Sequence, residues 1–190
     1  MDIHTAIATR RSIGKVKSDP VSREDIEKML EAATWAPNHR HTEPWKFFVM
    51  EGEGRGVLGR AYADIALDGV TGLSTEEEAQ QRSTHEKKAF RSPVIIAVAV
   101  TPSSGPQISE IEEFAAAHAA VQNMLLTAHS LGLGAVWRTG DPTYHPKMRA
   151  AFQLEAREHL VGFVYVGYPD MDTPKSSRVP FAQKTVWLNA

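Results

Sequence analysis

The amino-acid sequence predicts an α+β or α/β layered domain, because helical and extended segments alternate along the chain. Residues 94–100 and 160–166 are apolar on both faces, which is typical of central strands in a sheet that is covered on both sides. The Ala-rich residues 114–131 predict the longest helix, and Gly132 ends it. A chain of 190 residues is long enough to bury a substantial core, so we expect a single domain over residues 1–190.

The N-terminal part of the sequence predicts two helices. Residues 2–9 form the first, with Asp2 as its N-cap, and the basic pair that follows suits its C-terminus. Its buried stripe is expected to consist of Ile3, Ala6 and Ile7. The second helix begins at Ser22, where Asp25 three residues later forms a variant of the capping box, and Pro37 follows its end. Its buried face is expected to consist of Ile26, Met29, Leu30 and Ala33.

The other segments give weaker patterns. They are expected to form a strand at 46–50, a helix at 53–67, an extended segment at 135–138 and a short helix at 146–154. Residues 75–90 are rich in charged and amide side chains, which predicts an exposed helix or a mobile segment. The C-terminal residues, about 170–190, show no amphipathic pattern and are expected to pack as an arm across a neighbouring molecule or to be disordered.

Composition excludes several classes of function. A net charge of -2 and a pI of about 6.4 give no general attraction for nucleic acid or an anionic membrane. The absence of cysteine excludes disulfides, thiolate metal sites and thiol nucleophiles. The longest apolar run is far shorter than the ~20 residues of a membrane helix, and the N-terminus lacks a signal-peptide pattern. We therefore expect a cytoplasmic protein without nucleic-acid or membrane partners, in which any redox chemistry comes from a bound cofactor.

A glycine-rich motif at residues 54–59 matches the G-x-G-x-x-G fingerprint of dinucleotide-binding domains. That fingerprint also requires a second strand that ends in an acidic residue about 20 positions later, and residues 60–80 contain no such strand. Glu51 and Glu53 flank the motif and would repel a pyrophosphate. A dinucleotide-binding dehydrogenase is therefore the weaker alternative.

Histidines and serines give no independent catalytic site. His118 and His129 share a helix face but lie about 16 Å apart, too far for one metal ion, and are expected to be core or interface residues that form hydrogen bonds. His39 and His41 have no obvious carboxylate cluster to complete a metal site, so none is expected. The sequence lacks a G-x-S-x-G elbow, which argues against a serine hydrolase.

Four further segments are informative as a set. They are Arg10-Arg11-Ser12, the A-P-N-H-R-H-T-E-P-W segment 36–45, the G-L-G-A-V-W-R-T-G segment 132–140 and the segment 175–180. Their order and spacing resemble the nitroreductase family, in particular its small bacterial branch of about this length, over essentially the whole chain. The resemblance implies a nitroreductase-like α+β fold with a central mixed β-sheet flanked by helices. It also implies an intertwined homodimer that holds FMN non-covalently at the subunit interface.

The resemblance assigns roles to ten residues. Arg10 would bind the FMN phosphate, assisted by Ser12 and Arg178, because a guanidinium fork can grip a phosphate bidentately. Arg11 or Arg138 would stabilise negative charge at the N1–C2=O edge of the reduced ring. The residues that reach the flavin from the other subunit would be Trp35, His39 and His41. The segment that lies against the cofactor would be Trp137, Arg138 and Thr139.

The implied reaction is a ping-pong hydride transfer from NADH or NADPH, through flavin N5, to a nitroaromatic, quinone or similar small-molecule acceptor. No catalytic side chain is expected, since the flavin carries the electrons. Residues 60–90 are expected to form a lid that governs substrate choice. The sequence departs from the family pattern at His41 and Glu43, where many relatives carry Asn and Gln, and at Ser176, where a Lys is usual. A non-enzymatic flavin-binding or flavin-storage protein of the same fold is therefore the main alternative.

Overall fold

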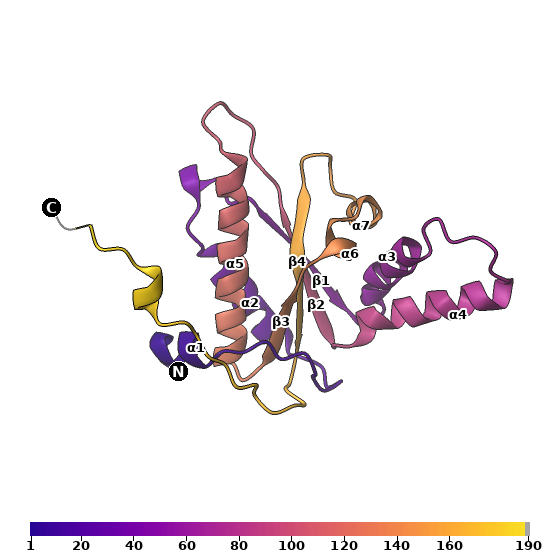
Figure 1. Ribbon diagram of the computed structural model, residues 1–190, viewed down its shortest axis with the longest axis horizontal. Helices are drawn as coiled ribbons and strands as arrows, with labels where there is room; N and C mark the ends of the chain where they lie inside the picture. Colours follow the sequence, from indigo (N-terminus) through magenta and orange to yellow (C-terminus); the bar gives the residue numbers. More distant parts are fainter. Residues whose placement is uncertain (189–190) are drawn as a thin grey trace.

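The structure is a computed structural model that describes residues 1–188, and its sheet has helices on both faces (Figure 1). The helices are α1 (Ile3–Thr9), α2 (Arg23–Thr34), α3 (Gly56–Ala66), α4 (Thr75–Glu86), α5 (Glu110–Ser130), α6 (Asp141–Tyr144) and α7 (Pro146–Ala151). The strands are β1 (Trp45–Glu51), β2 (Val94–Val100), β3 (Gly134–Arg138) and β4 (His159–Gly167). Short 3-10 helices are η1 (His39–His41), η2 (Gly52–Arg55), η3 (Lys87–Phe90) and η4 (Phe181–Lys184).

The sheet has the strand order β1-β2-β4-β3, and each of its pairings is antiparallel. The expectation of a mixed sheet was therefore wrong for the described residues. Strands that alternate with helices along a chain are often parallel, because a helix connects one strand to the next. Here α3 and α4 lie between β1 and β2, but the chain returns in the opposite direction, so β2 is antiparallel to β1. The dinucleotide-binding alternative fails for the same reason, because it requires a parallel βαβ unit.

The glycine-rich motif has a structural explanation instead. Residues 54–59 end η2 and open α3, and α3 packs along α4. A Cβ atom on Gly59 would lie 3.1 Å from the carbonyl oxygen of Glu86, so a glycine here lets the two helices approach closely.

The two faces of the sheet are buried by different helices. On one face α2 and α5 cover alternate residues of β2, and Met29, Met124 and Ile96 are fully buried in the same core cluster. On the other face α3 and α7 cover the remaining β2 residues, with Leu58 packed near Ile95. Every residue of β2 is therefore buried, which explains its uniformly apolar sequence and confirms it as a central strand.

Several local predictions are confirmed. The Ser22 hydroxyl accepts a hydrogen bond from the Asp25 backbone N–H at 3.1 Å and caps α2. The long helix ends just before Gly132, whose φ of 78° suits the glycine conformation that commonly follows a helix. Residues 75–90 form an exposed helix, α4, followed by η3. The short helix α6 was not predicted, because its four residues give too little periodicity.

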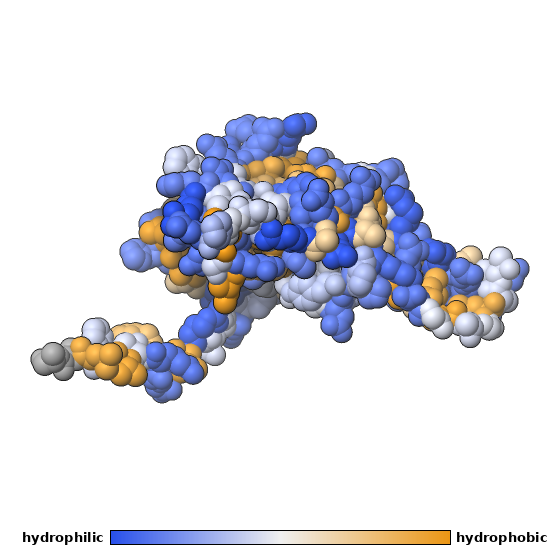
Figure 2. Space-filling model, turned by 90° about the horizontal axis from the view of Figure 1, so that it is seen from above, coloured by the Kyte–Doolittle hydropathy of each residue, from blue (hydrophilic) through white to orange (hydrophobic). Residues whose placement is uncertain are grey.

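The expected stripe of α1 was only partly right. Ala6 is buried, whereas Ile3 and Ile7 remain 57% and 58% exposed. The two isoleucines point away from the body of the chain, so any apolar partner for them must come from elsewhere. The C-terminal arm passes near α1 (Figure 1), and its apolar residues are also exposed (Figure 2).

None of the helices in residues 1–188 has the length and apolar composition that a membrane crossing requires.

Candidate functional site

A first cavity, of about 270 Å³, lies at the start of β3. Its wall includes Arg10 and Arg11 from the end of α1 and His129 from the end of α5. The Ile13 backbone N–H donates to the Ala135 carbonyl at 3.0 Å, which fixes the segment after α1 along the outer edge of β3. This approach requires Gly134, because a Cβ atom there would lie 2.7 Å from the Ile13 side chain.

The charges around this cavity are mutually repulsive. Partial burial, and then the neighbouring charges of Arg11 and Arg178, lower the pKa of Arg10. Within residues 1–188, none of these three arginines forms an ion pair with a carboxylate. The structure thus brings together Arg10, Arg11 and Arg178, and Ser12 directly follows Arg11 in the chain with its side chain exposed. Such a group of unneutralised cations is what an anion-binding site requires.

His129 adds a titratable group to the same cavity. The Thr9 hydroxyl donates its single hydrogen to the Thr5 carbonyl at 2.6 Å, so its oxygen must accept from His129 Nε2 at 2.8 Å. That bond places the proton of the neutral imidazole on Nε2 and leaves Nδ1 as an acceptor. Burial, and then the charges of Arg10 and Arg11, lower the pKa of His129. The expected hydrogen bond is confirmed, but the sequence did not indicate the neighbouring cations.

A second cavity, of about 620 Å³, lies between the end of β3 and the α3–η3 wall. It is lined by Tyr62, Ile65, Ala66, His85, Lys88, Arg91, Val136, Trp137, Arg138, Thr139, Pro142, Thr143 and Tyr165. The Arg138 guanidinium carbon lies 5.2 Å from the centre of the Tyr165 ring, and its buried Nε has no hydrogen-bond partner. Gly14 lies beside the guanidinium, and a Cβ atom there would be in ordinary van der Waals contact with Arg138 Nη2, at 4.0 Å.

The two arginines that the sequence left as alternatives differ in their contacts. Arg11 Nη1 donates to the carbonyls of Ala8 and Arg10, both at 2.8 Å, and so satisfies the C-terminal end of α1. Arg138 lines the large cavity and forms no side-chain hydrogen bond in the described part of the chain. Of these two arginines, Arg138 is therefore the one that is available to a ligand, at the end of β3.

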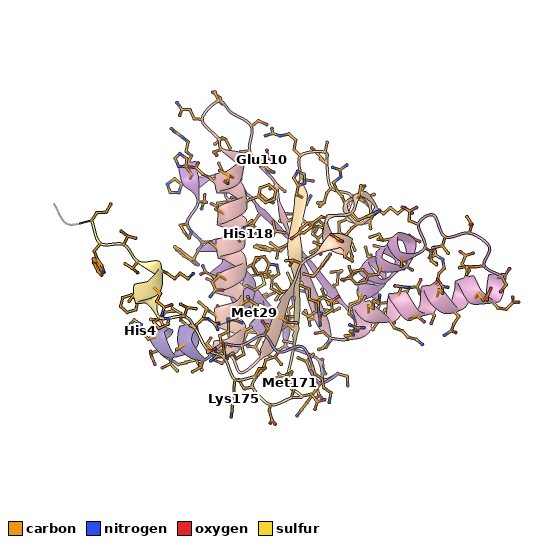
Figure 3. The ribbon with its side chains drawn as sticks, in the orientation of Figure 1. His4, Met29, Glu110, His118, Met171 and Lys175 are labelled. Carbon is orange, nitrogen blue, oxygen red and sulfur yellow. The ribbon has the colours of Figure 1, made fainter. Side chains whose placement is uncertain are left out.

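Trp137 is held on the opposite side of β3. Its Nε1 donates to the Val161 carbonyl at 3.2 Å, and its ring centre lies 5.5 Å from that of His118, which projects from the middle of α5 (Figure 3). Gly162 lies directly beneath the indole with a φ of 150°, where a Cβ atom would be 2.6 Å from Trp137 Cδ1. Gly162 is thus a positioning residue that the sequence analysis missed, although a glycine inside an apolar strand was a usable signal.

Trp35, His39 and His41 do not reach either cavity within one chain. Trp35 is 80% exposed at the end of α2, and the two histidines lie on η1. The η1 loop is fixed by the buried Glu113, whose carboxylate accepts hydrogen bonds from Thr42 Oγ1 at 2.6 Å and the Ser103 N–H at 3.0 Å.

Comparison with known proteins identifies the fold. Residues 7–168 match the model of the nitroreductase family. The chain belongs to the nitroreductase family. It is 30% identical over 180 residues to the "Putative NAD(P)H nitroreductase YdjA" of Escherichia coli K12, and the match covers 95% of each chain. Membership of this family classes the chain with NAD(P)H-dependent flavin oxidoreductases.

Solved nitroreductase-type structures share this architecture. A nitroreductase-like family protein from Bacillus cereus superposes with a TM-score of 0.85 at 30% identity, covering 100% of this chain and 97% of the other. A "putative nitroreductase in complex with FMN" from Desulfovibrio desulfuricans superposes with a TM-score of 0.76 at 28% identity, covering 100% and 98%. The predicted nitroreductase-like α+β fold is therefore confirmed, apart from the antiparallel sheet.

Proposed function

We propose that this chain is an FMN-dependent oxidoreductase that transfers a hydride from NADH or NADPH to a nitroaromatic, quinone or similar acceptor by a ping-pong mechanism. The observation that carries the proposal is a pair of arginines, Arg10 at the start of β3 and Arg138 at its end, neither of which forms an ion pair with a carboxylate within residues 1–188. FMN has a dianionic phosphate at one end and an electron-accepting ring at the other, so it requires two separate cationic groups. The FMN complex of the Desulfovibrio relative supports this choice of cofactor.

Arg10, Ser12 and Arg178 would hold the phosphate. The Arg10 guanidinium lines the first cavity, and its pKa is lowered by burial and then by the charges of Arg11 and Arg178. A phosphate dianion between them would remove that repulsion and accept bidentate, charge-assisted hydrogen bonds. The geometry of one chain is thus consistent with the role that the family resemblance assigns to these residues.

Arg138 and the backbone of Trp137 would hold the ring. The Ala135 carbonyl points outward to Ile13, so the N–H and C=O groups of Trp137, two residues further along β3, also point outward. In the described residues neither group has a hydrogen-bond partner, so they could serve as donor and acceptor for the amide edge of a flavin. Bound FMN supplies the two-electron chemistry, while these residues orient the ring and stabilise its negative charge. No catalytic side chain is then needed, and none is assigned.

An intertwined homodimer with FMN at its interface completes the proposal. The exposed isoleucines of α1 and the apolar arm lack partners of their own in residues 1–188. Trp35 and the η1 histidines are likewise exposed, as side chains that reach a neighbouring subunit's flavin would be. We further propose that the dimer is cytoplasmic and acts on small molecules, with no nucleic-acid or membrane partner.

The visible spectrum of the purified protein tests the proposal directly. The protein is expected to be yellow and to bleach when NADH or NADPH is added without oxygen. A yellow sample that stays yellow with both reductants would support the flavin-storage alternative. A monomer without measurable affinity for added FMN would contradict the proposal as a whole.

The stability of the FMN-free protein should depend on His129 at mildly acidic pH. The folded chain lowers the His129 pKa below its ordinary value of 6.5, so the unfolded chain binds the proton more readily as the pH falls through that value. The melting temperature is therefore expected to fall between pH 7 and about 5.5, and to fall less in His129→Gln. The measurement is thermal unfolding of both proteins at the two pH values.

His4→Gln is the matched control, because His4 is an exposed residue on α1 (Figure 3). It should follow the wild type at both pH values. Equal losses for His129→Gln and the wild type would show that the Arg10–Arg11 environment does not control this imidazole. Added FMN should reduce the wild-type loss, since its phosphate would favour the imidazolium.

A further inference from the structure

The α3–η3 wall of the second cavity carries positive charge without a counter-ion. Lys88 and Arg91 line it, and neither forms an ion pair within residues 1–188. Lys88 Nζ lies 2.9 Å from His85 Nδ1, and burial, followed by the Lys88 charge, lowers the pKa of His85. The imidazole is therefore a neutral acceptor, which leaves two ammonium hydrogens of Lys88 free. Among the residues described, no Asp or Glu lines this cavity.

The remainder of the cavity suits a flat, weakly polar molecule. Its apolar lining comes from Ile65, Ala66, Val136 and Pro142. The hydroxyls of Tyr62 and Tyr165 lie 3.1 Å apart, and burial raises the pKa of both, so both stay protonated at neutral pH. One hydrogen joins the two oxygens, and the second remains available to a ligand. A volume of about 620 Å³ is in the range of small-molecule sites.

We propose that this cavity binds the oxidising substrate, and that the substrate class is an aromatic acceptor that bears a carboxylate. Lys88 and Arg91 hold the carboxylate at the α3–η3 wall, and the reducible group faces Arg138 at the end of β3. The inference rests on the proposed function, which places the flavin ring at that end. It assigns a chemical reason for substrate choice to Lys88, which belongs to the 60–90 segment, and to Arg91, which directly follows that segment.

The overall reaction with a nitro probe is balanced without any further reagent. The nitro compound, NAD(P)H and one proton give the nitroso compound, NAD(P)+ and water. The reductant loses a hydride, whose two electrons reduce the nitro group, and the departing oxygen leaves as water with the hydrogen of that hydride and one proton from solvent. The carboxylate is unchanged, so it contributes only to binding and orientation.

The experiment compares 4-nitrobenzoate with its neutral analogue 4-nitrobenzamide as acceptors. In the wild type, kcat/KM should be higher for the carboxylate. In Lys88→Met the ratio of the two kcat/KM values should fall about tenfold, mostly through KM, because one charge-assisted contact is lost. Lys87→Met is the matched control: Lys87 is the exposed neighbour on η3 and does not line the cavity, so this variant should keep both values.

Each outcome has a distinct meaning. A colourless wild type, or one that oxidises NAD(P)H with neither acceptor, contradicts the proposed function rather than the carboxylate site. If turnover is normal and the ratio of kcat/KM for 4-nitrobenzoate to that for 4-nitrobenzamide is the same in the wild type and Lys88→Met, the carboxylate site alone is contradicted. If Lys88→Met instead raises the KM for NADPH or NADH and leaves the ratio of the two acceptor kcat/KM values unchanged, Lys88 binds the reductant. That result also overturns the inference. Arg91→Gln is a second variant that should lower the ratio if Lys88→Met fails to fold.

Discussion

Replacement of Gly162 by alanine is expected to lower the free energy of unfolding by about 3–5 kcal/mol, or the melting temperature by roughly 10 °C. Two effects add. The φ of 150° at this position is poorly accessible to alanine, and the new methyl group would overlap the Trp137 indole and approach the Arg138 carbonyl to 2.9 Å. Gly162 also faces the register shift between Val98 and Ala99 of β2, so the sheet is already irregular there.

Thermal unfolding and near-UV circular dichroism would measure this effect, since the indole must move. Gly54→Ala is the matched control, because a Cβ atom on Gly54 would contact nothing within 4 Å. It should stay within about 0.5 kcal/mol of the wild type. If Gly162→Ala has the melting temperature and the near-UV circular dichroism spectrum of the wild type, Trp137 does not pack on Gly162.

Arg10→Ala is expected to weaken FMN retention by about a hundredfold. The variant would remove the two charge-assisted hydrogen bonds that we propose between Arg10 and the phosphate, each worth about 1.5 kcal/mol, and a hundredfold change in Kd corresponds to roughly 2.7 kcal/mol. The measurement is FMN release on dialysis, followed by fluorescence titration of the apoprotein. Arg178→Ala should have a smaller effect, because Arg178 Nη1 already donates to the Ser177 carbonyl at 2.8 Å.

Lys28→Ala provides the comparison for Arg10→Ala. It removes a positive charge from the exposed side of α2, where the ammonium pairs with Glu24 at 2.8 Å. It should therefore retain FMN as the wild type does. Equal retention by the two variants would remove Arg10 from the phosphate site.

Elements governed by local pattern could be predicted well. Residues 94–100 coincide with β2, because a short run of apolar, mostly β-branched residues between a proline and a threonine strongly favours a strand. The start of α2 was correct because a serine N-cap acts within three residues of itself. Both features are determined by residues close together in the sequence, so they could be predicted without knowledge of distant contacts.

Features that depend on distant contacts could not be predicted in the same way. The direction of the strands depends on how α3 and α4 turn the chain, which no periodicity records. The exposure of Ile3 and Ile7 depends on what packs beside α1, and an apolar stripe is the same whether the body of the chain or another molecule covers it. The family resemblance supplied the fold but not these details.

The same distinction between local and distant information applies to the residues of the candidate site. Arg10 and Arg138 belong to compact motifs and were named from the sequence. His129, Lys88 and Tyr165 come to the two cavities from other segments, and none of them lies in a motif. The roles of all ten predicted site residues remain predictions, and those of Trp35, His39 and His41 also require the proposed second subunit.

The paired hydroxyls of Tyr62 and Tyr165 have a consequence for the range of acceptors. Either oxygen can be the donor of the bond that joins them, so the spare hydrogen can be presented from either of two points. Switching between these arrangements needs only rotation about two C–O bonds. Acceptors of unequal length could then each find a hydrogen within reach, while the backbone around them stays still.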